Sequence, residues 1–343
     1  MGGVNRRIST LVVALVPILI FGMLLTMVTV PYVALGPGPT FDTLGEVEGK
    51  QVVDIEGTEV HPTSGHLNMT TVSQRDGLAL GRALVSWASG TDQRLPRELV
   101  YPPDKSQDEI GEANTKDFRQ SEDSAEYAAL DYLKYPLAVT VETVDEDGPS
   151  KGKLQEGDAI DAANNTPVAT LEGFQDILKG TKPGDKIVVD YRRKNAPAGI
   201  AEITLGKHPD KDQGLLGVGV LDAPWAPFTI DFNLANIGGP SAGLMFSLAV
   251  VDKLTTGDLN GAKFVAGTGT ISGDGKVGSI GGITHKITAA SEAGASVFLV
   301  PAENCDEAKT AREDGIELVK VDTLGQAIDS LRTISAGGEP PRC

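Results

Sequence analysis

Apolar and polar residues follow one another in a pattern that predicts one long apolar helix, followed by shorter helices and strands. The apolar helix is expected at residues 8–30, where 23 successive residues carry no charged side chain. At about 1.5 Å per residue, a helix of that length spans a hydrocarbon core of about 30 Å. The run is therefore a membrane anchor or a signal sequence. Because no clear small-x-small cleavage site follows it, an uncleaved anchor is favoured.

Two arginines, Arg6 and Arg7, stand directly before this apolar run. By the positive-inside rule, residues 1–7 stay in the cytoplasm and the chain after residue 30 is exported. The sequence thus predicts a single-pass protein of the cell membrane, with the bulk of the chain extracytoplasmic.

The segment between the anchor and residue 134 has weaker patterning. Residues 36–39, Gly-Pro-Gly-Pro, are typical of a turn-rich linker. Alternation predicts strands at residues 52–55 and 66–72, and a helical pattern follows at residues 77–87. Residues 93–120 are polar and broken by prolines, which predicts a long surface loop before a helix at residues 121–133.

A distinctive order of turns and strands fills residues 135–207. Strands are predicted at residues 137–144 and 186–192 and a helix at residues 171–178, with the turn Leu154-x-x-Gly157-Asp158-x-Ile160 between them. This succession resembles a PDZ domain of the kind attached to exported proteases. The resemblance implies peptide binding by strand addition, with backbone amides capturing a C-terminal carboxylate. The segment 135–138, Tyr-Pro-Leu-Ala, stands where the glycine-containing carboxylate loop is expected. Binding of internal segments, docking and a spacer without a ligand therefore stay open.

Helices and strands alternate beyond residue 208. The pattern predicts strands at residues 214–220, 228–232, 264–267, 297–300 and 317–321, a hairpin at 271–280, and helices at 242–254, 284–293, 306–314 and 324–331. The expected fold class is α+β.

A glycine-rich turn at residues 236–245, Asn-Ile-Gly-Gly-Pro-Ser-Ala-Gly-Leu-Met, runs directly into one of these helices. Proline suits the first helical position and glycine permits a sharp turn. Ser241 is therefore expected at the positive end of a helix dipole, among amides without helical partners, where an alkoxide or oxyanion is stabilised. The two interpretations are a nucleophile and an ordinary helix-capping serine.

A nucleophilic serine needs a base, and the four histidines stand in no recognisable triad context. At 100° per residue, Lys286 falls on the same helical face as the apolar residues Ile283, Ile287, Ala290 and Ala293. Burial on that face lowers a lysine pKa, so that its neutral amine can accept a proton from serine. The alternative is a lysine whose ammonium group reaches water past the helix edge.

The serine and lysine segments together resemble the proteolytic domain of Lon proteases. The matching residues are Gly239-Pro240-Ser241-Ala242-Gly243, Thr268-Gly269 and Ile280-Gly281-Gly282-Ile283-x-x-Lys286-x-x-Ala289-Ala290. Together with the anchor and the PDZ-like segment, they resemble the membrane-anchored Lon-like PDZ proteases of bacteria, which lack an ATPase domain.

This resemblance implies a Ser–Lys dyad, with Ser241 as nucleophile and Lys286 as base. It also implies a supporting threonine at Thr268 and an oxyanion hole of backbone amides from Gly239 to Ala242. Many Lon enzymes carry an acidic residue where this chain has Gly239, so any role of that carboxylate is absent here.

The resemblance further implies that the PDZ module is inserted into the protease fold. The expected domains are a cytoplasmic N-terminus (1–7), an anchor (8–30), a first protease part with the long polar loop (31–134), a PDZ domain (135–207), a catalytic part (208–335) and a tail (336–343). Lon-type domains tend to form hexameric rings, so a homo-oligomer is expected by resemblance.

Composition narrows the function further. Lys+Arg 30 against Asp+Glu 47 gives a net charge of −17, which argues against a nucleic-acid partner. The cysteines, Cys305 and Cys343, are too few for a metal cluster, and whether they pair stays open. Residues 269–276 lack the spacing of a Walker A motif, so ATP is not expected. We expect no other cofactor and no metal.

The expected function is an ATP-independent serine endopeptidase that cleaves proteins or peptides outside the cytoplasmic membrane. The alternative is a PDZ-based peptide-binding or scaffolding protein whose protease fold is inactive or dormant.

Overall fold

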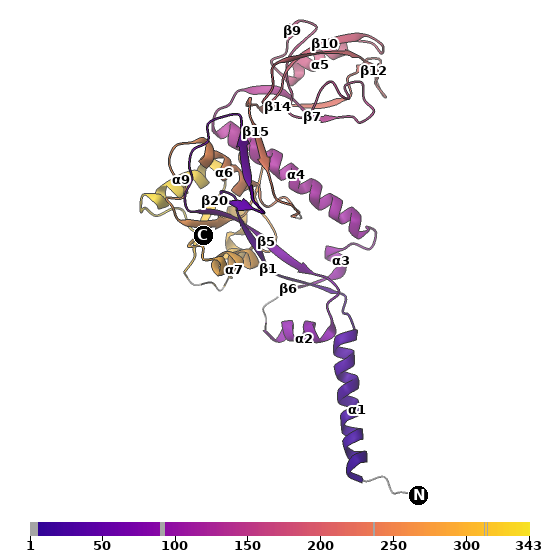
Figure 1. Ribbon diagram of the computed structural model, residues 1–343, viewed down its shortest axis with the longest axis vertical. Coiled ribbons are helices and arrows are strands. Elements are labelled where there is room, and N and C mark those ends of the chain that lie inside the picture. The colour runs from indigo at the N-terminus through magenta and orange to yellow at the C-terminus, as the bar shows by residue number, and fades with distance from the viewer. Residues whose placement is uncertain (1–5, 90–92, 236, 312, 314) are drawn as a thin grey trace.

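The computed structural model describes residues 6–89, 93–235, 237–311, 313 and 315–343 (Figure 1). Residues 1–5 of the expected cytoplasmic N-terminus lie outside the described residues, as do Asn236 and Asp314. A single helix, α1 (Arg6–Met27), projects from one end of the molecule, and a small sheet domain occupies the opposite end. Residues Thr10–Met27 of α1 have a mean hydropathy of 2.5 and are long and apolar enough to cross a membrane.

The larger domain is built on a mixed six-stranded sheet in the order β20-β19-β16-β5-β1-β6. Its strands are β1 (Tyr32–Asp42), β5 (His66–Arg75), β6 (Gln93–Pro96), β16 (Phe264–Gly267), β19 (Val297–Pro301) and β20 (Glu317–Val321). The pairs β5–β16, β16–β19 and β19–β20 are parallel, whereas β1 is antiparallel to both β5 and β6.

Helices cover both faces of this sheet. Because side chains of a strand alternate between faces, Val297 and Leu299 join the core formed with α4 (Gln107–Tyr132), α6 (Gly243–Leu254) and α9 (Leu324–Ser335). Phe298 and Val300 point the other way and pack with α7 (Ile283–Ala293) and α8 (Cys305–Ala308). The result is a three-layer arrangement that mixes parallel and antiparallel pairing, and the expected α+β class is confirmed.

Shorter elements complete this domain. They are α2 (Leu80–Ser89), α3 (Arg97–Val100), the 3-10 turn η1 (Ala302–Asn304) and the strand pairs β2 (Glu46–Val47) with β3 (Lys50–Gln51), β4 (Val53–Glu56) with β15 (Thr229–Phe232), and β17 (Thr270–Ile271) with β18 (Val277–Gly278).

The smaller domain has its own sheet and its own core. The strand order is β11-β10-β8-β7-β14, with β9 paired to β8. Its elements are β7 (Leu137–Val144), β8 (Ala159–Ala163), β9 (Thr166–Pro167), α5 (Leu171–Lys179), β10 (Lys186–Arg192), β11 (Gly199–Thr204), the hairpin β12 (Gly206–Lys207) and β13 (Gly214–Leu215), and β14 (Val218–Pro224). The sheet thus includes β14, which follows residue 207 in the sequence.

The segment 135–138, which stands where the PDZ resemblance implies a carboxylate-binding loop, lies at the start of this domain. These residues lead into β7, which is paired with β8 along one edge and with β14 along the other. A strand paired on both sides has no free edge to offer a peptide. The sheet ends at β14 and β11 instead.

Two expectations for the first part of the chain are wrong. Residues 36–39 lie inside β1 rather than in a linker, and the register of β1 against β5 shifts between Pro37 and Thr40, where the prolines interrupt the ladder. Residues 107–120 are helical rather than a surface loop. Ser106 and Glu109 form a capping box that starts α4, which then continues to Tyr132.

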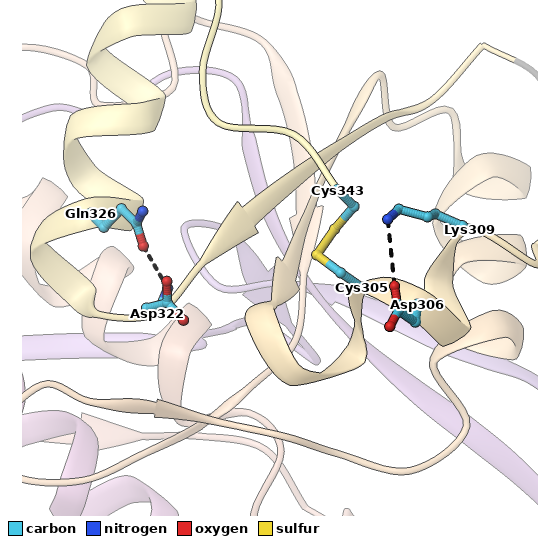
Figure 2. The surroundings of a disulfide bond; sticks show 6 residues. All are labelled: Cys305, Asp306, Lys309, Asp322, Gln326 and Cys343. Atoms are coloured by element: carbon cyan, nitrogen blue, oxygen red, sulfur yellow. Dashed lines mark hydrogen bonds and ion pairs between the residues drawn. A yellow bond between two sulfur atoms is a disulfide. The ribbon is translucent and has the colours of Figure 1, made fainter.

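The two cysteines form a disulfide (Figure 2). Cys343 lies beside β20, because its amide donates to the Leu318 carbonyl at 3.2 Å, and the bond joins it to Cys305 at the start of α8. The end of the expected tail is therefore fixed to the core of the larger domain.

Candidate active site

Ser241 lies in the turn between β15 and α6, two residues before the first helical residue, Gly243. Its carbonyl accepts hydrogen bonds from the Gly269 amide at 3.0 Å and from Thr268 Oγ1 at 3.1 Å. The Pro240 carbonyl accepts one from Ser121 Oγ at 3.1 Å. The turn is therefore held on both sides of the serine, although Ser241 itself does not cap the helix.

Gly239 gives this turn its direction. Its φ of 88° lies in the left-handed region that favours glycine. Its amide donates to the Asn114 carbonyl on α4 at 3.0 Å. The Gly239 amide is therefore already hydrogen-bonded. Within the segment expected to form an oxyanion hole, the amides after Pro240 are better placed to bind an oxyanion.

Lys286 reaches the serine from α7, on the other side of the sheet. Its Nζ lies 2.8 Å from Ser241 Oγ and 2.9 Å from Thr268 Oγ1. The lysine is 3% exposed, and lysine side chains are rarely buried to this extent in proteins. Ile283, Ile287 and Ala290 are buried beside it, whereas Ala293, expected on the same face, is exposed at the last turn.

Burial sets the charge state of this lysine. Removal from water lowers the Lys286 pKa from 10.5 to about 8. Thr268 Oγ1 donates its proton to the Ser241 carbonyl, so it faces the amine with a lone pair. The neutral amine can then donate one N–H to Thr268 and turn its own lone pair toward the Ser241 hydroxyl.

A pocket of about 480 Å³ opens onto these groups. Its described lining residues are Pro39, Phe41, Met69, Thr71, Val72, Gln74, Phe118, Ala235, Ile237, Gly238, Gly239, Ser241, Ala242, Gly281 and Lys286. We call this the catalytic pocket. It brings together the expected residues Ser241, Lys286, Gly239 and Ala242, with Thr268 buried behind the lysine. Within the described residues, no group of three or more His, Cys, Asp or Glu side chains is placed to hold a metal ion.

Three contributors to the site come from α4 and were missed from the sequence. Asn114 and Ser121 bind the backbone of the serine turn, and Phe118 lines the catalytic pocket. Gly243 allows this close approach, because an added Cβ would lie 2.7 Å from Ile271 Cγ2 and 3.0 Å from Ser121 Oγ. The Ser106-x-x-Glu109 capping signature could have revealed the helix, but not its position against the serine turn.

Comparisons with known protein families find two matches in this chain. The sequence model of the Lon protease (S16) C-terminal proteolytic domain matches residues 236–332, and that of the PDZ domain matches residues 116–201. Both catalytic candidates, Ser241 and Lys286, fall within the first match.

Individual relatives are similar over part of their length. Lon protease 2 of Bacillus subtilis is 36% identical over 95 residues, which are 28% of this chain and 17% of that protein. Archaeal Lon protease of Methanothermobacter thermautotrophicus is 37% identical over 95 residues, or 27% of this chain and 14% of that protein. A probable periplasmic serine endoprotease, DegP-like, of Ectopseudomonas mendocina is 34% identical over 100 residues, or 29% of this chain and 20% of that protein. The matched segment thus spans a fifth or less of each of these relatives.

Among solved structures, the PDZ domain of an SdrC-like protein from Listeria monocytogenes is 24% identical. The match covers 24% of this chain and 86% of that domain, with a TM-score of 0.23.

Proposed function

This chain contains a Lon-type serine protease domain and a PDZ domain, and we propose that it is an endopeptidase working through a Ser241–Lys286 dyad. The observation that carries the proposal is the 2.8 Å contact between Ser241 Oγ and the buried amine of Lys286. A serine hydroxyl is a weak nucleophile until a base takes its proton. A buried lysine with a lowered pKa supplies that base near neutral pH.

The acylation step follows from this contact. The neutral Lys286 amine accepts the Ser241 proton while Oγ attacks the scissile carbonyl, forming a tetrahedral intermediate. Backbone amides beside Ser241 and Ala242 stabilise its oxyanion. The Lys286 ammonium then returns the proton to the leaving amine, the C–N bond breaks, and an acyl-enzyme remains.

Deacylation reverses the roles with water as the nucleophile. Lys286 takes a proton from water as it attacks the ester, and then protonates Ser241 Oγ as the acid product leaves. Thr268 stays bound to Lys286 and to the Ser241 carbonyl throughout. It positions the amine rather than exchanging protons with the substrate.

The remaining features support a proposal about where the enzyme acts. We propose that α1 anchors the chain in the cell membrane and that the catalytic domain is extracytoplasmic. The Cys305–Cys343 disulfide supports an extracytoplasmic location, because disulfides persist in oxidising compartments. The PDZ domain would bind substrate or partner segments at a free edge of its sheet. The proposal includes proteolysis without ATP. It also includes assembly into a homo-oligomeric ring, which mass photometry in detergent can test.

The test is hydrolysis of labelled casein by the full chain in detergent, together with labelling of Ser241 by a fluorophosphonate. Ser241→Ala should abolish cleavage and labelling, and Lys286→Met should slow both by about 10²–10⁴-fold. A matched control is Lys253→Met, because Lys253 is also buried and hydrogen-bonds to Gln51 and the Val53 carbonyl, away from the serine.

Cleavage that survives in both folded dyad variants would refute the mechanism. A folded wild-type chain that neither cleaves casein nor labels at Ser241 would favour the alternative, a peptide-binding protein with an inactive protease fold.

A further inference from the structure

The short helix α2 exposes an unusual amount of apolar surface. Leu84, Val85 and Trp87 are 46%, 69% and 70% exposed, respectively. We call these three residues the α2 apolar surface. The helix carries one charged residue, Arg82, which is also exposed. Helices on the surface of a globular domain normally turn such apolar side chains toward the core.

The position of α2 in the molecule explains why these residues are not buried. The Leu80 amide donates to the Val28 carbonyl at 2.7 Å, and the Val30 amide donates to the Leu78 carbonyl at 2.9 Å. Gly81 approaches the last turn of α1 closely, because an added Cβ would lie 2.9 Å from the Leu25 carbonyl oxygen. Helix α2 therefore begins level with the end of α1, and Figure 1 shows it extending sideways from that end.

We propose that α2 is an interfacial helix whose apolar surface inserts into the membrane that α1 spans. The inference rests on the proposed membrane anchorage and goes beyond it, because it adds a second contact with the lipid. The partner is the boundary between headgroups and acyl chains. An amphipathic helix lies in this layer with its apolar residues about 5–10 Å deep.

The chemistry of the neighbouring residues fits that layer. Tryptophan and tyrosine concentrate at membrane interfaces. Trp87 lies on α2, and Tyr32, 43% exposed, lies at the start of β1 just after α1. The exposed guanidinium of Arg82 can bind lipid phosphates while its stem stays among apolar groups.

An interfacial α2 would fix the height of the catalytic pocket. Strand β1 starts at Tyr32, and Pro39, seven residues on, lines the pocket. At about 3.3 Å per residue, this places Pro39 within about 23 Å of the membrane end of the strand.

The experiment uses the full chain reconstituted in phosphatidylcholine and phosphatidylglycerol vesicles whose acyl chains carry bromine, which quenches tryptophan on contact. The sequence contains two tryptophans, so Trp225→Phe leaves Trp87 as the emitter. Trp225 is buried in the smaller domain. We expect brominated lipid to lower Trp87 emission, because insertion brings the indole to the level of the acyl chains, and aqueous iodide to have little effect.

The matched control moves the reporter to a remote site of similar exposure. Ile200 on β11 is 74% exposed, so a chain with Ile200→Trp and both natural tryptophans replaced by phenylalanine should respond to iodide and not to brominated lipid. Leu84→Asp combined with Val85→Asp should shift Trp87 toward the behaviour of this control.

Two results would overturn the inference. In the first, the chain stays in the vesicles after carbonate washing while Trp87 responds to iodide and not to bromine; α1 is then an anchor and α2 is not interfacial. In the second, the chain is released by carbonate, which removes the proposed anchorage and this inference with it. Fluorophosphonate labelling of the same samples reports on Ser241 independently of either result.

Discussion

The strongest prediction concerns the pH dependence of Ser241 reactivity. The reactive form needs a neutral Lys286, and burial lowers the pKa of this lysine to about 8. The neutral fraction then rises from about 9% at pH 7 to about 91% at pH 9. The rate of Ser241 modification should therefore increase about tenfold over this interval, with a midpoint near pH 8.

The assay is the second-order rate of fluorophosphonate labelling, quantified by mass spectrometry of the Ser241 peptide between pH 6 and 10. This measurement requires no knowledge of the natural substrate. Labelling of Lys253→Met should follow the wild-type profile. Lys286→Met should label about 10²–10⁴-fold more slowly, the usual contribution of a general base, and without the rise.

The same lysine makes stability depend on pH in a defined window. Its pKa is lower in the folded chain than in the unfolded chain, so the unfolded chain binds more protons between pH 8 and 10.5. Stability should rise with pH there by about 3 kcal/mol, at 1.36 kcal/mol per pKa unit. Lys286→Met should remove this rise.

A flat labelling profile from pH 7 to 9 in folded protein, or a midpoint near 10.5, would refute the assignment of Lys286 as a buried base.

Three further predictions follow from neighbouring contacts. Thr268→Val removes an acceptor of the Lys286 ammonium, so labelling of Ser241 should slow about tenfold. The midpoint of the pH profile should fall below 8, because the charged lysine loses a hydrogen-bond partner. An unchanged midpoint would contradict the contact between Thr268 and Lys286. Cys343→Ser opens a loop with a sequence separation of 38 residues and should lower the free energy of unfolding by up to about 4 kcal/mol, measured by urea denaturation, and reductant should then have no additional effect. Ser106→Ala should cost about 1 kcal/mol through loss of the α4 cap, whereas Ser106→Asp should retain most of the stability.

Strongly patterned elements could be predicted from the sequence. The strands β7, β10, β16 and β20 have the expected limits. The helices α6 and α7 each start within one residue of their expected first residue. In these elements the buried face imposes a clear period of apolar residues, as Ile283, Ile287 and Ala290 show on α7. The same period placed Lys286 on the apolar face of α7 and left open whether its ammonium group reaches water. The period could not predict the 2.8 Å distance between Lys286 Nζ and Ser241 Oγ, because the two residues come from elements on opposite faces of the sheet.

The first half of α4 could not be predicted in this way. Its exposed residues leave Phe118 as the first buried apolar side chain, about three turns into the helix. A helix that is polar nearly all round has no apolar stripe to reveal its period, so the capping box at Ser106 is its main local signal. The disulfide was open for a different reason: pairing of Cys305 with Cys343 depends on the C-terminal segment returning to β20, a long-range contact without a local pattern.

The distribution of the catalytic pocket over the chain separates chemistry from substrate contact. Ser241, Thr268 and Lys286 all fall within the Lon-type match at residues 236–332. Eight of the fifteen described lining residues of the pocket precede it, from β1, β5, α4 and the approach to the serine turn. Under the proposed mechanism, the match contains the groups that break the bond, whereas the other lining residues come from the part of the chain that also forms α1. Because β1 follows α1 and contributes Pro39 and Phe41 to the pocket wall, the proposed membrane anchor and the proposed substrate contacts share one structural element.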